Sequence, residues 1–296
     1  MSVAALPSAT LPRRPSAVAE FTRQQPLGAI SFVIICIMMF AGVFCQWVSP
    51  YDPLDIDFAS ILGPPSWQHW GGTDAFGRDI FSRIIWGSRT ALVIGFTSSF
   101  IGSTLGAILG VASAYFGGRI DTWIQRFVDI LLAFPIIVLA LVVVAALRKS
   151  VLFGIDVNLI YAIAIPIVPR VARVVRAAAL SIRTMPYVDA ARAAGYSNSR
   201  IIFRHMAPNV VAPYLIMFTA FIAQAILLEA SLSFLGLGVT EPTAAWGLML
   251  SGNAADFYRE APWMILFPGA AISLAVFAFN LFGDSLRDYL DPRFKT

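Results

Sequence analysis

The chain has 296 residues, of which 58% are hydrophobic and only 13% are charged, and its mean hydropathy is +0.76. A soluble globular domain is nearer to about half apolar and about a quarter charged, so this composition indicates an integral membrane protein. The net charge of +4 is modest and is better explained by membrane topology than by a nucleic-acid-binding surface.

The chain opens with residues 1–26, which are rich in Ala, Ser, Pro and Arg and predict a flexible cytoplasmic tail. The apolar run 27–49 can cross a bilayer, because a spanning helix needs about 20 apolar residues. It is too long for a signal peptide, and the string WVSP at 47–50 is no small-residue cleavage site. Cys36 and Cys45 would point to opposite faces of this helix, which excludes a disulfide between them.

The next segment, 50–90, is predicted to lie outside the membrane. It begins with Asp52, Asp55 and Asp57 and is glycine-rich in the middle, a combination that can form a metal-binding loop. The spacing of a calcium-binding EF-hand is absent, however. We therefore expect turns that build a scaffold on the outer face, and no metal site.

Five further apolar segments predict membrane-spanning helices, so that the protein is all-α with six spans and a core of five helices over 91–283. The fourth span of the chain is the weakest, because Pro166 and Pro169 interrupt it and Arg170 and Arg173 enter its end. The sequence after the last span, 284–296, predicts a short polar tail. The five segments are 91–116, 124–147, 154–176, 209–235 and 262–283.

Small residues in the second span predict close helix packing. Gly102, Gly106 and Gly110 recur every four residues, a spacing that lets two membrane helices approach backbone to backbone. The sequence leaves open whether their partner is another helix of this chain or a second subunit.

Two carboxylates lie within the predicted spans. Asp129 is expected to pair with nearby Arg126. Glu229 is costly in an apolar helix, so it either lines a translocation path or is satisfied near the outer interface, for example by Arg89.

The basic residues determine the predicted orientation. With both termini in the cytoplasm, 15 of the 21 basic residues lie inside, as the positive-inside rule requires. The six on the outside are Arg78, Arg83, Arg89, Arg148, Lys149 and Arg259.

The polar segment 184–206, between the fourth and fifth spans, predicts two short cytoplasmic helices. Thr184 can cap the first helix, and Pro186 and Asp189 both suit its first turn. Four alanines give this helix a small-residue surface, and Gly195 ends it where a positive φ is needed. These alanines are Ala190, Ala191, Ala193 and Ala194.

The second short helix is predicted to start at Ser197, to carry Arg200 and Arg204 on one face, and to end at Pro208. From the residues alone, an interfacial hairpin whose arginines bind lipid phosphates explains the segment equally well.

A family resemblance favours a different role for this segment. Asp189-Ala190-Ala191, Gly195 and Pro208 resemble the EAA motif of ABC importer permeases, E-A-A, three residues, G, nine residues, I-x-L-P. The sequence departs from this pattern at Asp189, His205 and Ala207. In the family, the segment is a coupling helix that docks on a cytoplasmic ATPase. The resemblance assigns coupling to Asp189, Ala190, Ala191, Ala194, Gly195, Arg200, Arg204 and Pro208.

Other strings are similar to C-type permeases of the dipeptide and oligopeptide (peptide/nickel) importers. They are HWGGTDAFGRD at 69–79, EASLSFLGLG at 229–238 and NLFGD at 280–284. The resemblance as a whole extends over nearly the entire chain from residue 27. The resemblance implies a type I importer permease fold that moves peptides or related small solutes inward.

The resemblance also implies the partners and the location. These are a second permease subunit, two P-loop ATPase subunits and an extracytoplasmic substrate-binding protein that docks on the outer loop, in the lipid of a prokaryotic inner membrane and without nucleic acid. The chain has no G-xxxx-G-K-[ST] string, so ATP and Mg²⁺ are expected only on the ATPase subunits, with no cofactor, metal site or catalytic residue here.

Two other functions are compatible with parts of the sequence. A secondary transporter or channel not coupled to ATP finds support only in Glu229, Asp129 and the prolines of the fourth span. An intramembrane hydrolase would need a nucleophile and a base, and no such pair is evident.

Overall fold

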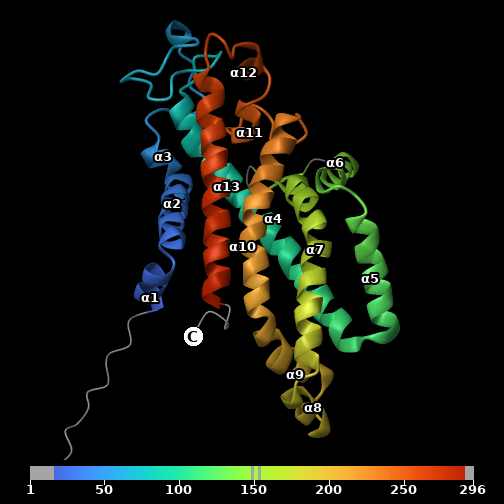
Figure 1. Ribbon diagram of the computed structural model, residues 1–296. Helices are drawn as coiled ribbons and strands as arrows, with labels where there is room; N and C mark the ends of the chain where they lie inside the picture. The colour runs from blue at the N-terminus through green and yellow to red at the C-terminus, as the bar shows by residue number, and fades with distance from the viewer. Residues whose placement is uncertain (1–16, 148–149, 153–154, 291–296) are drawn as a thin grey trace, which may run out of the picture.

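The computed structural model describes residues 17–147, 150–152 and 155–290, and this part of the chain is almost entirely helical (Figure 1). Parts of the predicted tails, 1–16 and 291–296, and the basic residues Arg148 and Lys149 lie outside the described residues. The elements before residue 157 are α1 (Ala17–Gln24), α2 (Pro26–Val43), α3 (Cys45–Val48), a 3-10 turn (Phe58–Ser60), α4 (Ile80–Phe116), α5 (Gly118–Leu132), α6 (Ile136–Ala146), β1 (Val151–Leu152) and β2 (Ile155–Asp156). Those after it are α7 (Val157–Arg183), α8 (Pro186–Ala193), α9 (Asn198–Ile201), a π-helical turn (Ile202–Met206), α10 (Ala207–Phe234), α11 (Trp246–Met249), α12 (Asn253–Asp256) and α13 (Trp263–Leu290).

The six-span, all-α prediction is confirmed. Five of the described helices are long and apolar enough to cross a membrane, and α5 with α6 adds a sixth if that pair counts as one span. Several helices run further than their apolar stretch. The helix α4 begins at Ile80 rather than at residue 91, α7 continues to Arg183 and α13 to Leu290, since polar residues prolong a helix once it leaves the hydrocarbon.

The third span is bent, which the sequence analysis did not anticipate. The helices α5 and α6 meet at 94°, with the break at Pro135. Proline has no N–H to donate and restricts the residue before it to extended conformations, so a helix ends there. In contrast, Pro166 and Pro169 lie inside the continuous helix α7. The predicted interruption of this span is therefore not found. Helices packed in a membrane bundle tolerate such prolines. Separately, the Arg170 guanidinium donates to the Pro166 carbonyl at 2.9 Å.

The helices α4 and α7 pack along the three glycines of α4. A methyl group added to Gly102, Gly106 or Gly110 would lie 2.7, 2.6 or 2.7 Å from a backbone carbonyl oxygen of α7. The partner that the sequence left open is therefore a helix of the same chain. Only glycine allows this approach, because any side chain would displace the facing backbone.

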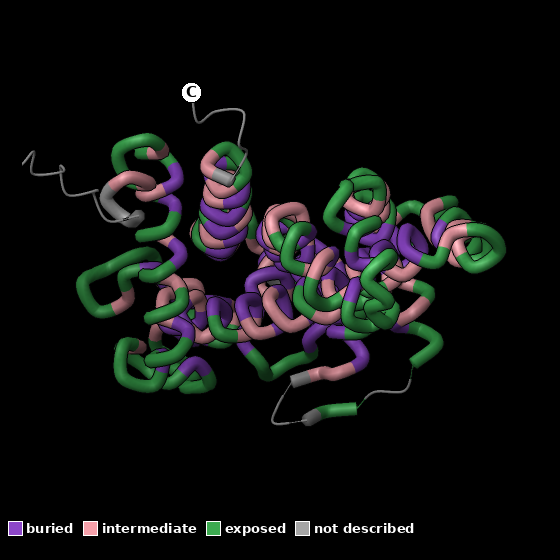
Figure 2. Tube along the Cα trace, turned by 90° about the horizontal axis from the view of Figure 1, so that it is seen from below, coloured by how far each residue is buried: buried purple, intermediate pink, exposed green. Residues whose placement is uncertain are grey.

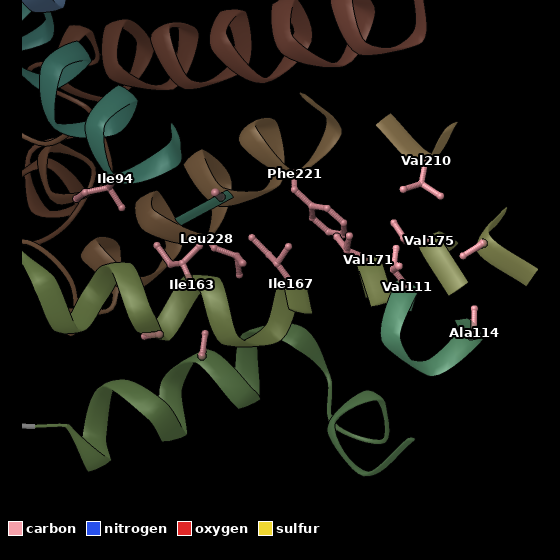
Figure 3. Close-up of a cluster of buried hydrophobic side chains, with 14 of the residues drawn as sticks. Ile94, Val111, Ala114, Ile163, Ile167, Val171, Val175, Val210, Phe221 and Leu228 are labelled. Atoms are coloured by element: carbon pink, nitrogen blue, oxygen red, sulfur yellow. The ribbon is translucent and has the colours of Figure 1, made fainter. Parts of the chain in front are cut away.

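Apolar side chains of α4, α7 and α10 fill the centre of the bundle (Figure 3). Figure 2 shows buried residues where the helices meet and exposed residues on the outer faces. On α2, the exposed side chains are apolar, for example Leu27 at 61% and Ile37 at 62%. In a membrane protein such faces contact lipid, and exposed Trp47 and Trp67 suit the interface, where tryptophan is enriched.

Ion pairs attach α5 to α7. Asp121 of α5 accepts two hydrogen bonds from the Arg176 guanidinium, at 2.7 and 2.6 Å, and another from Ser113 of α4. Asp129 pairs with Arg173 of α7. The predicted pairing of Asp129 with Arg126 on its own helix is thus wrong, because α7 places a guanidinium closer.

Parts of the predicted tails are helical. The helix α1 lies within 1–26, where Phe21 packs edge-on against Phe282 and Tyr289 of α13, with ring centroids 6.4 and 5.4 Å apart. The expectation of flexibility is wrong for residues 17–24, since aromatic contacts hold this helix against the bundle.

The glycine packing predicts a stability difference between two Gly→Ala substitutions within helices. Gly106→Ala should cost about 1–3 kcal/mol, because the new methyl group collides with the Val168 carbonyl. Gly269→Ala is the matched control, since nothing lies within 4 Å of its added methyl group. Thermal unfolding in detergent measures both, and equal midpoints would contradict the packing.

The two α5–α7 ion pairs predict a second difference. Asp121→Asn should lower the free energy of unfolding by on the order of 1–3 kcal/mol. The substitution removes a carboxylate that accepts two hydrogen bonds from Arg176 and is about three-quarters buried. Asp129→Asn should cost less than about 1 kcal/mol, since its pair is about half exposed and screened by solvent. The same thermal measurement compares them, and a larger loss for Asp129→Asn would refute this ranking.

Candidate functional site

The helix α8 begins at a different cap from the one predicted. The cap residue is Met185, whose side chain makes no capping bond, and Thr184 instead donates to the Ser181 carbonyl at the end of α7. The prediction for Thr184 is wrong because α7 extends to Arg183 and uses this residue at its own end. Pro186 occupies the first turn as expected, and Asp189 pairs with Arg192 at 2.9 Å.

Gly195 forms the elbow between the two short helices. Its φ is +75°, which confirms the predicted left-handed conformation. The Gly195 N–H donates to the Arg192 carbonyl at 2.9 Å, and the Tyr196 N–H donates to the Ala191 carbonyl at 3.1 Å. This pair of bonds is the Schellman helix ending, which satisfies carbonyls that would otherwise lack partners. The elbow is therefore fixed by backbone hydrogen bonds.

The second short helix is part of a much longer one. Ser197 caps α9 by accepting from the Arg200 N–H, as predicted. Beyond Ile201 the chain makes a π-helical turn and enters α10, so that residues 198–234 form one span. Pro208 does not end the helix, contrary to the prediction. It lies directly after the π-helical turn, and the chain stays helical through it.

The alanines of α8 do not all face outward. Ala190 and Ala194 are exposed, whereas Ala191 is only 5% exposed and packs with Val188 into the central core. The predicted alanine surface is wrong for Ala191, because one face of α8 must pack against the bundle. An exposed surface remains, with Asp189, Ala190, Ala194 and Gly195; we call it the elbow surface.

Aromatic and basic side chains lie beside the elbow surface. The Arg200 guanidinium is 4.1 Å from the centre of the Tyr196 ring, which stacks on His205. Arg204 and Phe203 are exposed, Phe203 at 76%. This end of the molecule can thus offer both charge and apolar area to a partner.

Tyr115 connects the elbow to α4 and was missed by the sequence analysis. Its hydroxyl donates to the Asn198 side chain at 2.8 Å, and the Arg192 guanidinium lies 5.7 Å from the centre of its ring. Arg183 donates to the Ala114 carbonyl at 2.9 Å. A lone tyrosine at the end of an apolar span carries no sequence signal for such a long-range contact.

Glu229 is completely buried, and its nearest partner is on its own helix. One carboxylate oxygen accepts from the Ser233 hydroxyl at 2.8 Å, and this hydroxyl accepts from the Val239 N–H at 3.1 Å. Neither a solvated Glu229 nor a pair with Arg89 is found, because the side chain turns toward the loop after α10.

The 69–79 string folds into the outer cap of the bundle. Asp79 caps α4, and Arg78 binds Asp74 at 2.6 Å and Glu241 at 2.9 Å. Burial favours a lower pKa for the Arg78 guanidinium, but the bond to Glu241 and the charge of Asp74 outweigh burial and raise the pKa above its ordinary value. Hydrogen bonds from the Ser60 hydroxyl and the Ala59 N–H lower the pKa of Asp57. Within the described residues, no three His, Cys, Asp or Glu side chains are placed to hold a metal ion.

Known proteins resemble this chain over most of its length. Residues 102–296 match the family model described as "Binding-protein-dependent transport system inner membrane component". A protein of Brucella suis named as a permease of a peptide transport system is 43% identical over 266 residues, covering 90% of this chain and 88% of the relative. The dipeptide transport system permease protein DppC of Alkalihalophilus pseudofirmus is 41% identical over 274 residues, covering 93% and 88%.

A solved structure shares the fold. A chain of the MetNI methionine ABC transporter, in an inward-facing conformation, aligns with a TM-score of 0.57 and 19% identity, covering 72% of this chain and 98% of its own length. The chain therefore belongs to the inner membrane components of binding-protein-dependent transport systems: it is a permease subunit of an ABC importer, a multi-pass protein that works with separate ATPase and substrate-binding proteins.

Proposed function

We propose that this chain forms one half of a heterodimeric pore that imports short peptides. The peptide substrate is supported by the names of relatives that are 43% and 41% identical. The different partner subunit is supported by the resemblance of 69–79 and 229–238 to C-type permeases.

The proposed contact with the ATPase is the elbow surface. It is exposed, rigid, and built on a segment that continues directly into α10. This continuity is the observation that carries the proposal, because a force on α8 and α9 acts at once on a membrane-spanning helix. The bonds from Tyr115 and Arg183 pass the same force to α4.

In this mechanism, ATP binding closes two ATPase subunits, and each subunit moves the permease that it holds. The bundle then changes between inward-open and outward-open forms, a two-state element biased by the nucleotide. ATP and Mg²⁺ reside on the ATPase subunits, so this chain needs no cofactor of its own.

The proposed orientation has both termini in the cytoplasm. The helix α1, the C-terminal end of α13 and the elbow lie at the same end of the bundle (Figure 1). Most of the described arginines in the loops and helix ends lie near this end, including Arg183, Arg192, Arg200 and Arg204. This agrees with the positive-inside rule.

A bulky side chain on the elbow surface should separate this chain from its ATPase. Ala194→Trp is exposed and should fold normally, yet it should reduce co-purification of the P-loop ATPase about tenfold or more, since a large group blocks a tight docking surface. The measurement is a mild-detergent pull-down of the tagged chain with mass identification of its partners.

The matched control is Ala255→Trp, an exposed alanine at the outer end, which should retain the ATPase. The second permease should be recovered with both variants. Normal ATPase recovery with Ala194→Trp would reject the elbow as the docking site.

The orientation can be tested by thiol labelling in intact cells, with Cys36 and Cys45 replaced by alanine. A membrane-impermeant reagent should modify Asp55→Cys at once and Ala194→Cys only after the membrane is opened, because the two exposed positions lie on opposite sides. The reverse pattern would invert the topology.

A further inference from the structure

A cavity of about 620 Å³ lies at the outer end of the bundle. Residues of α4, of the β1–β2 hairpin, of the loop after α10 and of the segment 52–54 line it. Its size is within the range of pockets that enclose drug-sized ligands. It is at the opposite end of α4 from Tyr115 and the elbow, so it belongs to neither the ATPase contact nor the outer cap described above.

The lining carries both signs of charge. Arg89 of α4 contributes a guanidinium, and Asp156, which precedes α7, contributes a carboxylate, as does Asp52 from the outer segment. Arg89 is exposed, and within the described part of the chain it makes no ion pair. A ligand with separate positive and negative groups could therefore bind both signs at once.

Two buried polar atoms of the lining residues lack partners among the described residues. They are the indole N–H of Trp86, a donor, and one carboxylate oxygen of Asp156, an acceptor. Both atoms have almost no accessible surface, so the cavity is lined by other atoms of these two residues.

The remaining lining suits side chains of varied kind. Leu54, Val93, Ile94 and Val239 provide apolar area, and Thr240 and Thr243 add hydroxyl groups. This mixture of apolar and hydroxyl groups would suit side chains of different kinds between the charged groups.

We infer that this cavity binds a short zwitterionic peptide, with its carboxylate on Arg89 and its ammonium group on the carboxylates of Asp156 and Asp52. The identity of the ligand rests on the proposed function, whereas the charges of the lining are independent of it. Peptide bound here lies between the outer surface and the spans, where a solute released by a binding protein enters.

Cysteine protection tests this site on the complete permease–ATPase complex in lipid nanodiscs. With Cys36 and Cys45 replaced by alanine, Thr243→Cys reports from the cavity wall and Asp55→Cys from the outer loop outside it. Tri-alanine should slow modification of Thr243→Cys by an impermeant thiol reagent and leave Asp55→Cys unaffected. The N-acetylated, C-amidated tri-alanine, which has no terminal charges, should protect neither.

The charged residues are tested in the same assay. Arg89→Gln and Asp156→Asn should each raise the half-protecting concentration of tri-alanine about tenfold, because each loses a charge-assisted hydrogen bond. Arg259→Gln, an exposed outer arginine outside the cavity, should leave it unchanged. Equal protection in all three variants, or protection by the blocked peptide, would overturn the assignment. Thr240→Cys serves as a second reporter if Thr243→Cys does not assemble.

Uptake of tri-alanine by proteoliposomes with the binding protein separates the two proposals. Uptake by the wild type without protection at Thr243→Cys overturns the cavity site and leaves the peptide importer intact. Absence of peptide uptake by an assembled, ATP-hydrolysing complex overturns the peptide substrate itself, whereas protection of Thr243→Cys with the predicted charge dependence would still support the cavity.

Discussion

The close approach of α4 to α7 is the constraint on which the rest of the structure depends. In a bilayer, helices gain little from the hydrophobic effect when they associate, so contact between backbones must hold them together. Gly102, Gly106 and Gly110 provide that contact over three successive turns. Because both helices are continuous here, the contact fixes their ends as well as their middles. The cavity and the elbow are built on those ends.

The helix α4 is a single rod of 37 residues, about 55 Å long at 1.5 Å per residue. Trp86 and Arg89 lie near its outer end, and Tyr115 lies at its inner end beside the elbow. A rod held against α7 along its middle cannot bend locally to absorb a displacement at one end. In the proposed mechanism, a movement of the elbow would therefore be transmitted to the cavity wall through packed helices.

The sequence predicted those features that depend on local chemistry. Six spans follow from apolar length, and the turn at Gly195 and the cap at Ser197 follow from residues that favour these conformations in any context. The errors concern neighbours distant in sequence. Whether Ala191 faces solvent depends on where the bundle lies, and the partner of Asp129 depends on the position of α7. The bend at Pro135 had a local signal, but hydropathy alone ran across it.

The buried carboxyl group of Glu229 helps to position the loop that follows α10. Through the Ser233 hydroxyl it holds the Val239 N–H, at the start of the loop that walls the cavity. The other end of this loop is tied to α4, since Thr90 donates to the Ala244 carbonyl at 2.9 Å and the Trp246 indole donates to the Ile84 carbonyl at 2.9 Å. A wall fixed at both ends loses little conformational entropy when a ligand binds. Glu229 thus helps to position this loop through one carboxylate oxygen, while its other oxygen is buried without a partner among the described residues.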